Sequence, residues 1–290
     1  MRLIIRVAVL CVGLLASLQV TAADLPQRWV SAGGALSEWV SALGGESKLV
    51  GVDTTSQHLE SLKKLPSIGY QRSLSAEGIL SLRPDILIGS EEMGPPPVIA
   101  QVRSAKVQVE LFSAQPDLPT LEKNLTHLGQ LLGAQAQATQ LLESYQQQLA
   151  MQKARVAELQ TRHKAPGVLV LIGHAGGKPL IAGKDTVADW LLQRAGGHNL
   201  ATHTGYKPFS VESLAGLDPE VLVLADRALS GEAAKAALFK ENPILNSSRA
   251  AKTRRVLELD PTLLVGGLGP RLPAALKGLS DGLYPTASGQ

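Results

Sequence analysis

Residues 69–89 read GYQRSLSAEGILSLRPDILIG, and much of this segment recurs later in the chain. Residues 75–88 begin Ser-Ala-Glu and continue through Pro-Asp into an apolar run. They align without gaps with residues 210–223, SVESLAGLDPEVLV. The dipeptide Gly69-Tyr70 likewise has a counterpart in Gly205-Tyr206. Because repeated supersecondary units imply repeated structure, the sequence predicts two similar halves.

Apolar runs with the length of buried strands alternate with segments of helical spacing in both halves. These runs cover residues 28–31, 48–53, 85–89, 107–111, 168–172 and 221–225. Such alternation is typical of a parallel sheet with helices on its faces. We therefore expect an α/β fold with two similar Rossmann-like lobes, each built on a central parallel sheet.

A long helix is expected between the two halves. Residues 134–162 are rich in Ala, Gln, Leu, Glu and Lys, which are good helix formers, and Gly133 suggests a break before them. A long surface helix is the plainer interpretation, and a spine joining two lobes is the sharper one. The spine leaves a ligand cleft between the lobes, where the carboxyl ends of parallel strands bind ligands. The expected organisation is an N-terminal lobe over 24–118, a connecting segment over 119–163 and a C-terminal lobe over 164–290.

The first 23 residues have the pattern of a cleavable secretory signal peptide. Arg2 and Arg6 precede an apolar run over 7–18 that is too short to span a bilayer, and small residues follow it. A short membrane anchor is the alternative. The only cysteine, Cys11, lies inside this segment, so the exported chain has no thiol for a disulfide or a metal site. The periplasm is the simplest compartment for such a protein.

The overall charge argues against a nucleic-acid partner. The chain has 28 Lys and Arg against 25 Asp and Glu, and two of the arginines belong to the signal segment. Because the remainder is nearly balanced and has no basic run, we expect no binding to nucleic acid.

The signal segment, the two lobes, the spine helix and the Ser-x-Glu…Leu-x-Pro-Asp/Glu repeat together resemble the substrate-binding proteins of metal-chelate ABC importers. That family takes up cobalamin, ferric siderophores and haem. Residues 69–77, GYQRSLSAE, look like its haem-binding branch. The resemblance implies a monomeric, non-enzymatic haem carrier that serves an outer-membrane haem receptor system and an inner-membrane ABC permease. Cobalamin or a ferric siderophore is the alternative ligand. An exported α/β hydrolase is a rival of another class, but no Gly-x-Ser-x-Gly motif occurs.

The resemblance implies that Tyr70 is an axial ligand to the haem iron and that Arg72 hydrogen-bonds its oxygen. A free phenol titrates near about pH 10, but ferric iron and an adjacent guanidinium both favour the phenolate. A tyrosinate is a hard oxygen ligand, and tyrosine ligation of haem has precedent. In an extended loop, residues two apart lie on the same side, so Arg72 is expected to reach the phenolate. A loop tyrosine packed on a helix is the structural alternative.

Three residues of the second half are candidates for the same cleft. Arg227 follows the apolar run 221–225, and the resemblance implies that it enters the cleft, either on a propionate or over the distal face. Tyr206 is expected to be an aromatic of the cleft wall, because Pro208 and Phe209 replace the arginine context. His174 follows the run 168–172 and is either a turn histidine or an iron ligand for a second haem.

The resemblance also implies that two acidic residues at corresponding places in the repeat contact the transporter. The resemblance matches Glu77 and Glu212 to residues that dock on arginines of the permease. Each follows a serine, Ser75 or Ser210, that can cap a helix, so their charge also suits a helix N-terminus. The remaining histidines show no paired ligand spacing and are expected at the surface: His58, His127, His163, His198 and His203.

Overall fold

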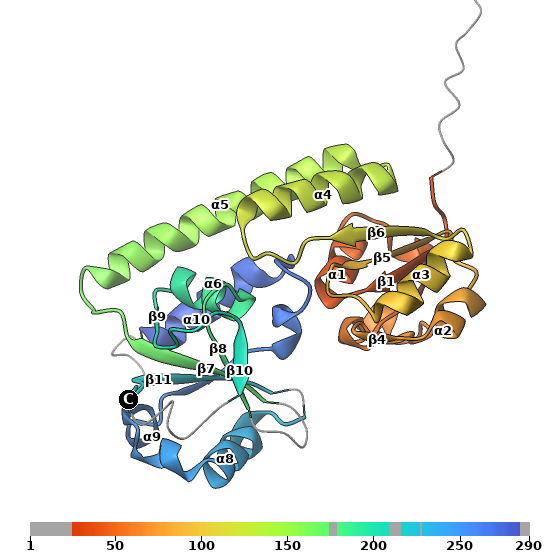
Figure 1. Ribbon diagram of the computed structural model, residues 1–290. Coiled ribbons are helices and arrows are strands. Elements are labelled where there is room, and N and C mark those ends of the chain that lie inside the picture. Colours follow the sequence, from red (N-terminus) through yellow and green to blue (C-terminus); the bar gives the residue numbers. More distant parts are fainter. Residues whose placement is uncertain (1–24, 174–178, 209–215, 227, 285–290) are drawn as a thin grey trace, which may run out of the picture.

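The computed structural model describes residues 25–173, 179–208, 216–226 and 228–284, which form two α/β lobes beside a long helix (Figure 1). The predicted signal peptide, together with His174, Glu212 and Arg227, lies outside the described residues. The arrangement confirms the expected α/β class, the two lobes and the helical spine. Among the described residues, no helix is both long enough and apolar enough to cross a membrane.

The N-terminal lobe contains a wholly parallel sheet in the order β2-β1-β5-β6. Every residue of β1 and β5 is buried, as expected for strands covered on both faces. The strands are β1 (Trp29–Ala32), β2 (Leu49–Val52), β5 (Ile86–Ser90) and β6 (Gln108–Phe112). The helices are α1 (Gly34–Ala42), α2 (Ala76–Ser81) and α3 (Pro96–Ser104), with short 3₁₀ turns at Glu46–Lys48, Thr54–Ser56 and Glu60–Leu62.

The C-terminal lobe has a mixed sheet rather than a wholly parallel one. Its main order is β10-β8-β7-β11-β12, and β9 also pairs with β7. Strands β8 and β10 run antiparallel to their neighbours, whereas β9, β11 and β12 continue the parallel part. The strands are β7 (Gly167–Gly173), β8 (Leu180–Ala182), β9 (His198–Asn199), β10 (Tyr206–Pro208), β11 (Val221–Asp226) and β12 (Val256–Glu258). The helices are α6 (Val187–Arg194), α8 (Gly231–Glu241), α9 (Arg249–Lys252) and α10 (Leu272–Leu283), with 3₁₀ turns at Pro243–Ser247 and Pro261–Leu264.

The repeated Gly-Tyr dipeptide occurs in a different setting in each lobe. Gly69–Tyr70 forms β3, which pairs with β4 (Ser73–Leu74) in a small hairpin apart from the main sheet. Tyr206 instead begins β10, the antiparallel strand at the end of the second sheet. The glycines Gly69 and Gly205 have φ angles of 89° and 75°, a region that favours glycine in both lobes. The local turn is therefore shared, but the tyrosines that follow it are not equivalent.

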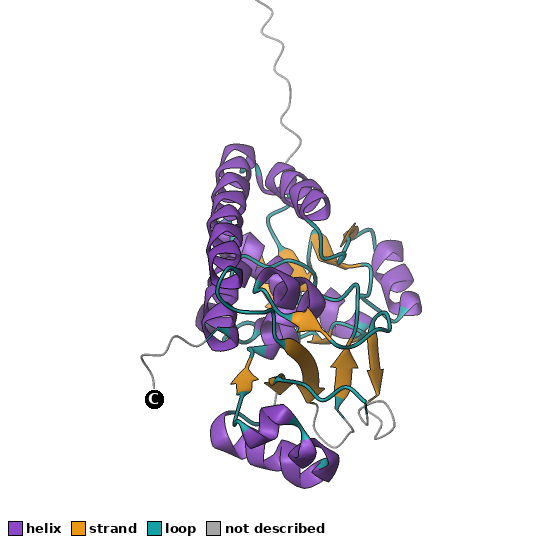
Figure 2. Ribbon diagram, turned by 90° about the vertical axis from the view of Figure 1, so that its left-hand side faces the viewer, coloured by secondary structure: helices purple, strands orange, loops and turns teal. Residues whose placement is uncertain are grey.

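The spine consists of two consecutive helices. Helix α4 (Leu118–Leu132) begins at Asp117, whose side chain accepts a hydrogen bond from the Thr120 N–H at 2.7 Å. It ends at Gly133, which has a left-handed φ of 71°. Helix α5 (Gln135–Gln160) then runs along one side of the molecule (Figure 2). Gly133 therefore provides the break that the sequence suggested before the long helix.

Both lobes pack against α5 and share one apolar core. The ring of Tyr145 on α5 lies 5.9 Å from that of Trp39 on α1. Further along α5, Gln152 Nε2 donates to the carbonyl of Leu276 on α10 at 3.3 Å. The core cluster that contains Trp39 also contains Trp190 of α6. The spine is therefore anchored to each lobe by specific side-chain contacts.

Candidate ligand-binding site

The hairpin that carries Tyr70 is fixed to the loop that follows β5. The Gly94 N–H donates to the carbonyl of Gln71 at 2.9 Å, and the Leu74 N–H donates to the carbonyl of Gly94 at 2.9 Å. Because that loop leaves the carboxyl end of β5, the hairpin lies at the edge of the sheet where α/β proteins bind ligands. Tyr70 is 37% exposed there, which leaves a large aromatic side chain accessible.

Arg72 lies in the tight turn of this hairpin, not in the extended loop that the sequence suggested. Its Nη2 is 2.6 Å from Oε2 of Glu92, and both side chains are about half exposed. The hydrogen bond with Glu92 raises the pKa of Arg72 against the effect of burial, and the nearby Tyr70 and Tyr206 raise it further. A phenolate on either tyrosine would therefore interact with this guanidinium.

Tyr206 approaches the same guanidinium from the second lobe. Although 39% of its surface reaches solvent, burial raises its pKa to about 12, against a hydrogen bond with Thr186. The charge of Glu92 raises this pKa further, and the charge of Arg72 lowers it. The structure therefore brings together Tyr70 and Arg72 of one lobe and Tyr206 of the other.

Glu92 belongs to this group and was not anticipated from the sequence. It is the second residue after β5, at the carboxyl end of a buried strand, which is the same signal that singled out Arg227. Its neighbour Glu91 is directed elsewhere, because Glu91 Oε1 accepts from Ser113 Oγ at 3.3 Å. The position after β5 could thus have singled out Glu91 and Glu92 together, but it could not show that Glu92 is the one that contacts Arg72.

Glu77 lies in the first turn of α2, the helix that follows the Tyr70 hairpin in the chain. Ser75 caps that helix as expected, because its Oγ accepts from the Gly78 N–H at 3.2 Å. The side chain of Glu77 is exposed. It is therefore accessible at the helix N-terminus, where a carboxylate is favoured.

The described residues offer no conventional chelating cluster. Within 25–173, 179–208, 216–226 and 228–284, no three or more His, Cys, Asp or Glu side chains are placed to hold a metal ion. An iron that arrives inside a porphyrin already has its equatorial ligands and takes only axial atoms from the protein. The Tyr70 hairpin is consistent with that kind of ligand.

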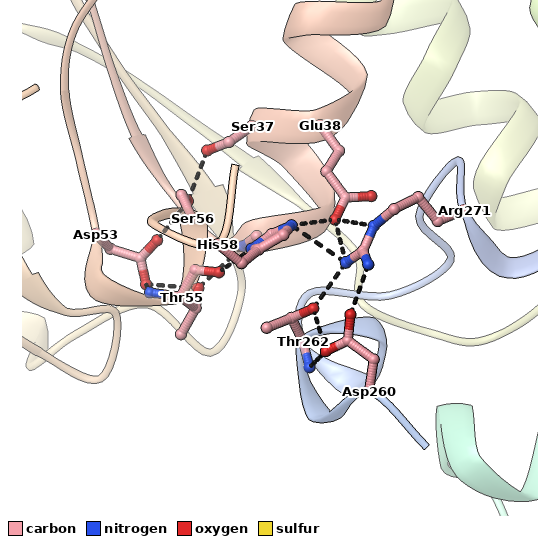
Figure 3. Close-up of polar contacts among 10 residues, drawn as sticks. Ser37, Glu38, Asp53, Thr55, Ser56, His58, Asp260, Thr262 and Arg271 are labelled. Atoms are coloured by element: carbon pink, nitrogen blue, oxygen red, sulfur yellow. Dashed lines mark hydrogen bonds and ion pairs between the residues drawn. The ribbon is translucent and has the colours of Figure 1, made fainter. Parts of the chain in front are cut away.

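A second polar cluster joins the two lobes (Figure 3). Glu38 on α1 is 5% exposed, and its Oε1 accepts from Nε and Nη2 of Arg271 at 2.9 and 2.7 Å. Arg271, which directly precedes α10, also donates to Asp260 Oδ2 at 2.6 Å and to Thr262 Oγ1 at 2.7 Å. The cluster therefore connects a buried carboxylate of the first lobe to an arginine of the second.

His58 belongs to the cluster around Glu38, so its expected place at the surface is wrong. Its Nε2 lies 2.7 Å from Oε1 of Glu38, and its Nδ1 lies 2.9 Å from the carbonyl of Thr55. The side chain is 16% exposed. The hydrogen bond with Glu38 is the main cause that raises the pKa of His58. The residue fills a structural position between the lobes rather than a ligand position.

Buried hydrogen bonds around Asp53 hold the neighbouring loop in place. Asp53 follows β2 and is fully buried. Its carboxylate accepts from the Gly33 N–H at 3.0 Å, from Thr55 Oγ1 at 2.7 Å and from Ser56 Oγ at 2.7 Å. The loop that carries His58 is thereby fixed to the end of β1.

Comparison with known proteins places the chain in a family. The sequence profile described as periplasmic binding protein matches residues 30–263. The crystal structure of a periplasmic haem-binding protein from Pseudomonas aeruginosa is 62% identical, with a TM-score of 0.89 over 91% of this chain and 95% of that one. An uncharacterized ABC transporter substrate-binding lipoprotein of Bacillus subtilis, YvrC, is 27% identical over 92% of this chain and 82% of its own length. A vitamin B12-binding protein of Yersinia pestis is 25% identical over 73% of this chain and 74% of its own. The chain belongs to the periplasmic binding protein family.

Proposed function

We propose that this protein is a periplasmic haem carrier that delivers haem to an ABC importer of the inner membrane. The proposal is supported by the 62% identity to a periplasmic haem-binding protein over almost the whole chain. The observation that carries it is the hairpin that holds Tyr70 and Arg72 at the carboxyl end of β5, fixed there by backbone hydrogen bonds to Gly94. The function is binding and transfer, and it requires no catalytic step.

In this proposal Tyr70 supplies the axial oxygen to ferric haem iron. Binding of Fe(III) displaces the phenolic proton, because the metal and a nearby cation both favour the charged form of the ligand. Arg72 provides that cation from the hairpin turn. Tyr70 is 37% exposed, so part of this residue faces the solvent from which a planar ligand would enter.

The other predicted residues have supporting parts in this proposal. Arg227 binds the haem from the second lobe, on a propionate or over the distal face, and Tyr206 contacts the porphyrin as a cleft-wall aromatic. His174 is the candidate ligand for a second haem. Glu77 and Glu212 dock on arginines of the permease, and the exposure of Glu77 on α2 supports its part in this contact. An outer-membrane haem receptor system supplies the haem.

A hemin titration followed by absorption spectroscopy tests the iron ligand. Wild-type protein should develop a ferric spectrum with tyrosinate-to-iron charge-transfer bands. Tyr70→Phe should abolish those bands, because it removes the ligating oxygen and keeps the ring. Tyr206→Phe is the matched control, since it deletes the hydroxyl of the tyrosine that aligns with Tyr70 in the sequence repeat, and it should keep the bands. Charge-transfer bands that persist in Tyr70→Phe would refute the assignment.

Cobalamin is the second candidate ligand, favoured by the similarity to a vitamin B12-binding protein. A parallel titration with cobalamin and with ferric siderophores separates the two proposals. Haem should bind more tightly than either, and the binding should depend on Tyr70. Cobalamin binding that is tighter than haem binding and indifferent to Tyr70→Phe would instead support the second candidate.

A further inference from the structure

Glu92 and Arg72 form an ion pair whose two loops are held together by backbone hydrogen bonds. Gly94 exchanges backbone hydrogen bonds with Gln71 and Leu74, which lie on either side of Arg72 in the hairpin. Glu92 is on the same short loop as Gly94, so its carboxylate is presented directly to the guanidinium, at 2.6 Å. The pairing is therefore a consequence of how the two loops are joined, not of two long side chains that meet by chance in solvent.

This pair adjoins the proposed iron ligand, because Arg72 lies in the turn of the hairpin that carries Tyr70. A phenolate on Tyr70 or Tyr206 would act on the guanidinium of Arg72, and the charges of Arg72 and Glu92 act on the hydroxyl of Tyr206. A bound ferric porphyrin would bring a phenolate and two propionates to a region that already holds one carboxylate. Like charges disfavour each other, so the charge of Glu92 opposes this arrangement.

The haem site thus has a cation that is already neutralised before the ligand arrives. We propose that Glu92 is an affinity-determining residue of the haem site, whose negative charge offsets Arg72 and weakens the binding of an anionic chelate enough to permit its release. The inference rests on the proposed function. A transport protein must surrender its ligand, and a fixed counter-charge achieves this without a change in the iron ligand.

The expected size of the effect follows from Coulomb's law. If the separation from the bound anionic groups is taken as about 6 Å, a unit charge in surroundings between bulk water and a half-exposed protein surface changes a dissociation constant by roughly threefold to tenfold. Both partners of the pair are about half exposed, so the effect should shrink as salt screens it.

The test is a hemin titration of Glu92→Gln at low and high ionic strength. This substitution removes the charge and keeps an oxygen that can accept from Arg72. We expect hemin to bind roughly threefold to tenfold more tightly at low salt, with a smaller gain at high salt. Damage to the structure would weaken binding instead of tightening it, so the direction of the change separates a charge effect from a loss of packing.

Two control variants complete the experiment. Glu91→Gln makes the same charge change one residue earlier, on a side chain that contacts Ser113, and should leave the affinity within about twofold of wild type. Glu92→Asp keeps the charge and should also remain near wild type. Equal affinities for Glu92→Gln and Glu91→Gln, or weaker binding by Glu92→Gln, would overturn the inference while the haem function stands. A wild-type protein without a Tyr70-dependent hemin spectrum would reject the proposed function itself, and this inference with it.

Discussion

Removal of Arg271 should loosen the junction between the lobes. Its guanidinium makes two of the three side-chain contacts to Oε1 of the buried Glu38, and the third comes from His58. Arg271→Met keeps most of the apolar stem and deletes the charge. The substitution leaves a carboxylate that is 5% exposed with His58 as its remaining side-chain partner. The cost therefore arises from an under-compensated buried charge rather than from lost packing.

The magnitude can be worked from the exposure of the two partners. Breaking a fully buried ion pair from one side costs about 3–5 kcal/mol. Arg271 is 35% exposed, and His58 still compensates Glu38, so the loss should be smaller. We expect Arg271→Met to lower the free energy of unfolding by about 2 kcal/mol. Glu38→Gln combined with Arg271→Met should cost less than the sum of the two single changes, by about 1–2 kcal/mol, because the groups are in direct contact.

Urea unfolding of the ligand-free protein at pH 7 measures these quantities. Arg162→Met is the matched control, because Arg162 pairs with Glu158 in an exposed i,i+4 contact at 3.4 Å. Its effect should stay within about 0.5 kcal/mol. A loss below about 0.5 kcal/mol for Arg271→Met, or simple additivity in the double variant, would refute the view that Arg271 compensates a buried charge.

Two further predictions concern pH and transport. The hydrogen bond with Glu38 raises the pKa of His58 above its ordinary value of 6.5. The protonated imidazole therefore stabilises the fold fully below pH 6.5, and this stabilisation is lost as the pH rises through the pKa of the folded state. The difference in unfolding free energy between wild type and His58→Asn should therefore be larger at pH 6 than at pH 9, and a difference that grows with pH would contradict this. Glu77→Lys should weaken the stimulation that this protein exerts on the ATPase of the reconstituted transporter, most strongly at low salt. Glu122→Lys, a charge reversal at another exposed position on α4, should leave that stimulation unchanged. Equal losses in both variants would exclude a specific docking contact.

Much of the fold could be predicted because its signals are local. The buried strands β1, β5 and β11 are short, uninterrupted apolar runs, and the repeat around Ser75 made two lobes the natural interpretation. The antiparallel strands β8 and β10 could not be foreseen. Each has three residues, and their direction is set by pairing across the sheet rather than by their composition. The sequence repeat indicated similar lobes, but it does not specify the direction in which such short strands pair.

The site was only partly predictable, because its decisive contacts join distant segments. Tyr70 and Arg72 are only two residues apart in the chain, so the sequence could suggest both. The partner of Arg72 could not be identified, because Glu92 is directed to it by hydrogen bonds between two separate loops. His58 was misplaced for the same reason, since its partner Glu38 is 20 residues away and Arg271 is 213 residues away. Spacing rules cannot recognise a histidine whose role is set by such partners.

The two tyrosines of the repeat show why one of them is the better candidate for an iron ligand. Burial raises the pKa of Tyr206 to about 12, so forming its phenolate costs more than it does for a free phenol. Its neighbour two residues on is Pro208, so the cation that acts on Tyr206 is Arg72 of the other lobe rather than a residue of its own segment. Tyr70 is followed at the same interval by Arg72, in a hairpin turn held by Gly94. The repeat therefore supplied two tyrosines that align in sequence, and the asymmetry of their surroundings favours a single oxygen ligand on the first lobe.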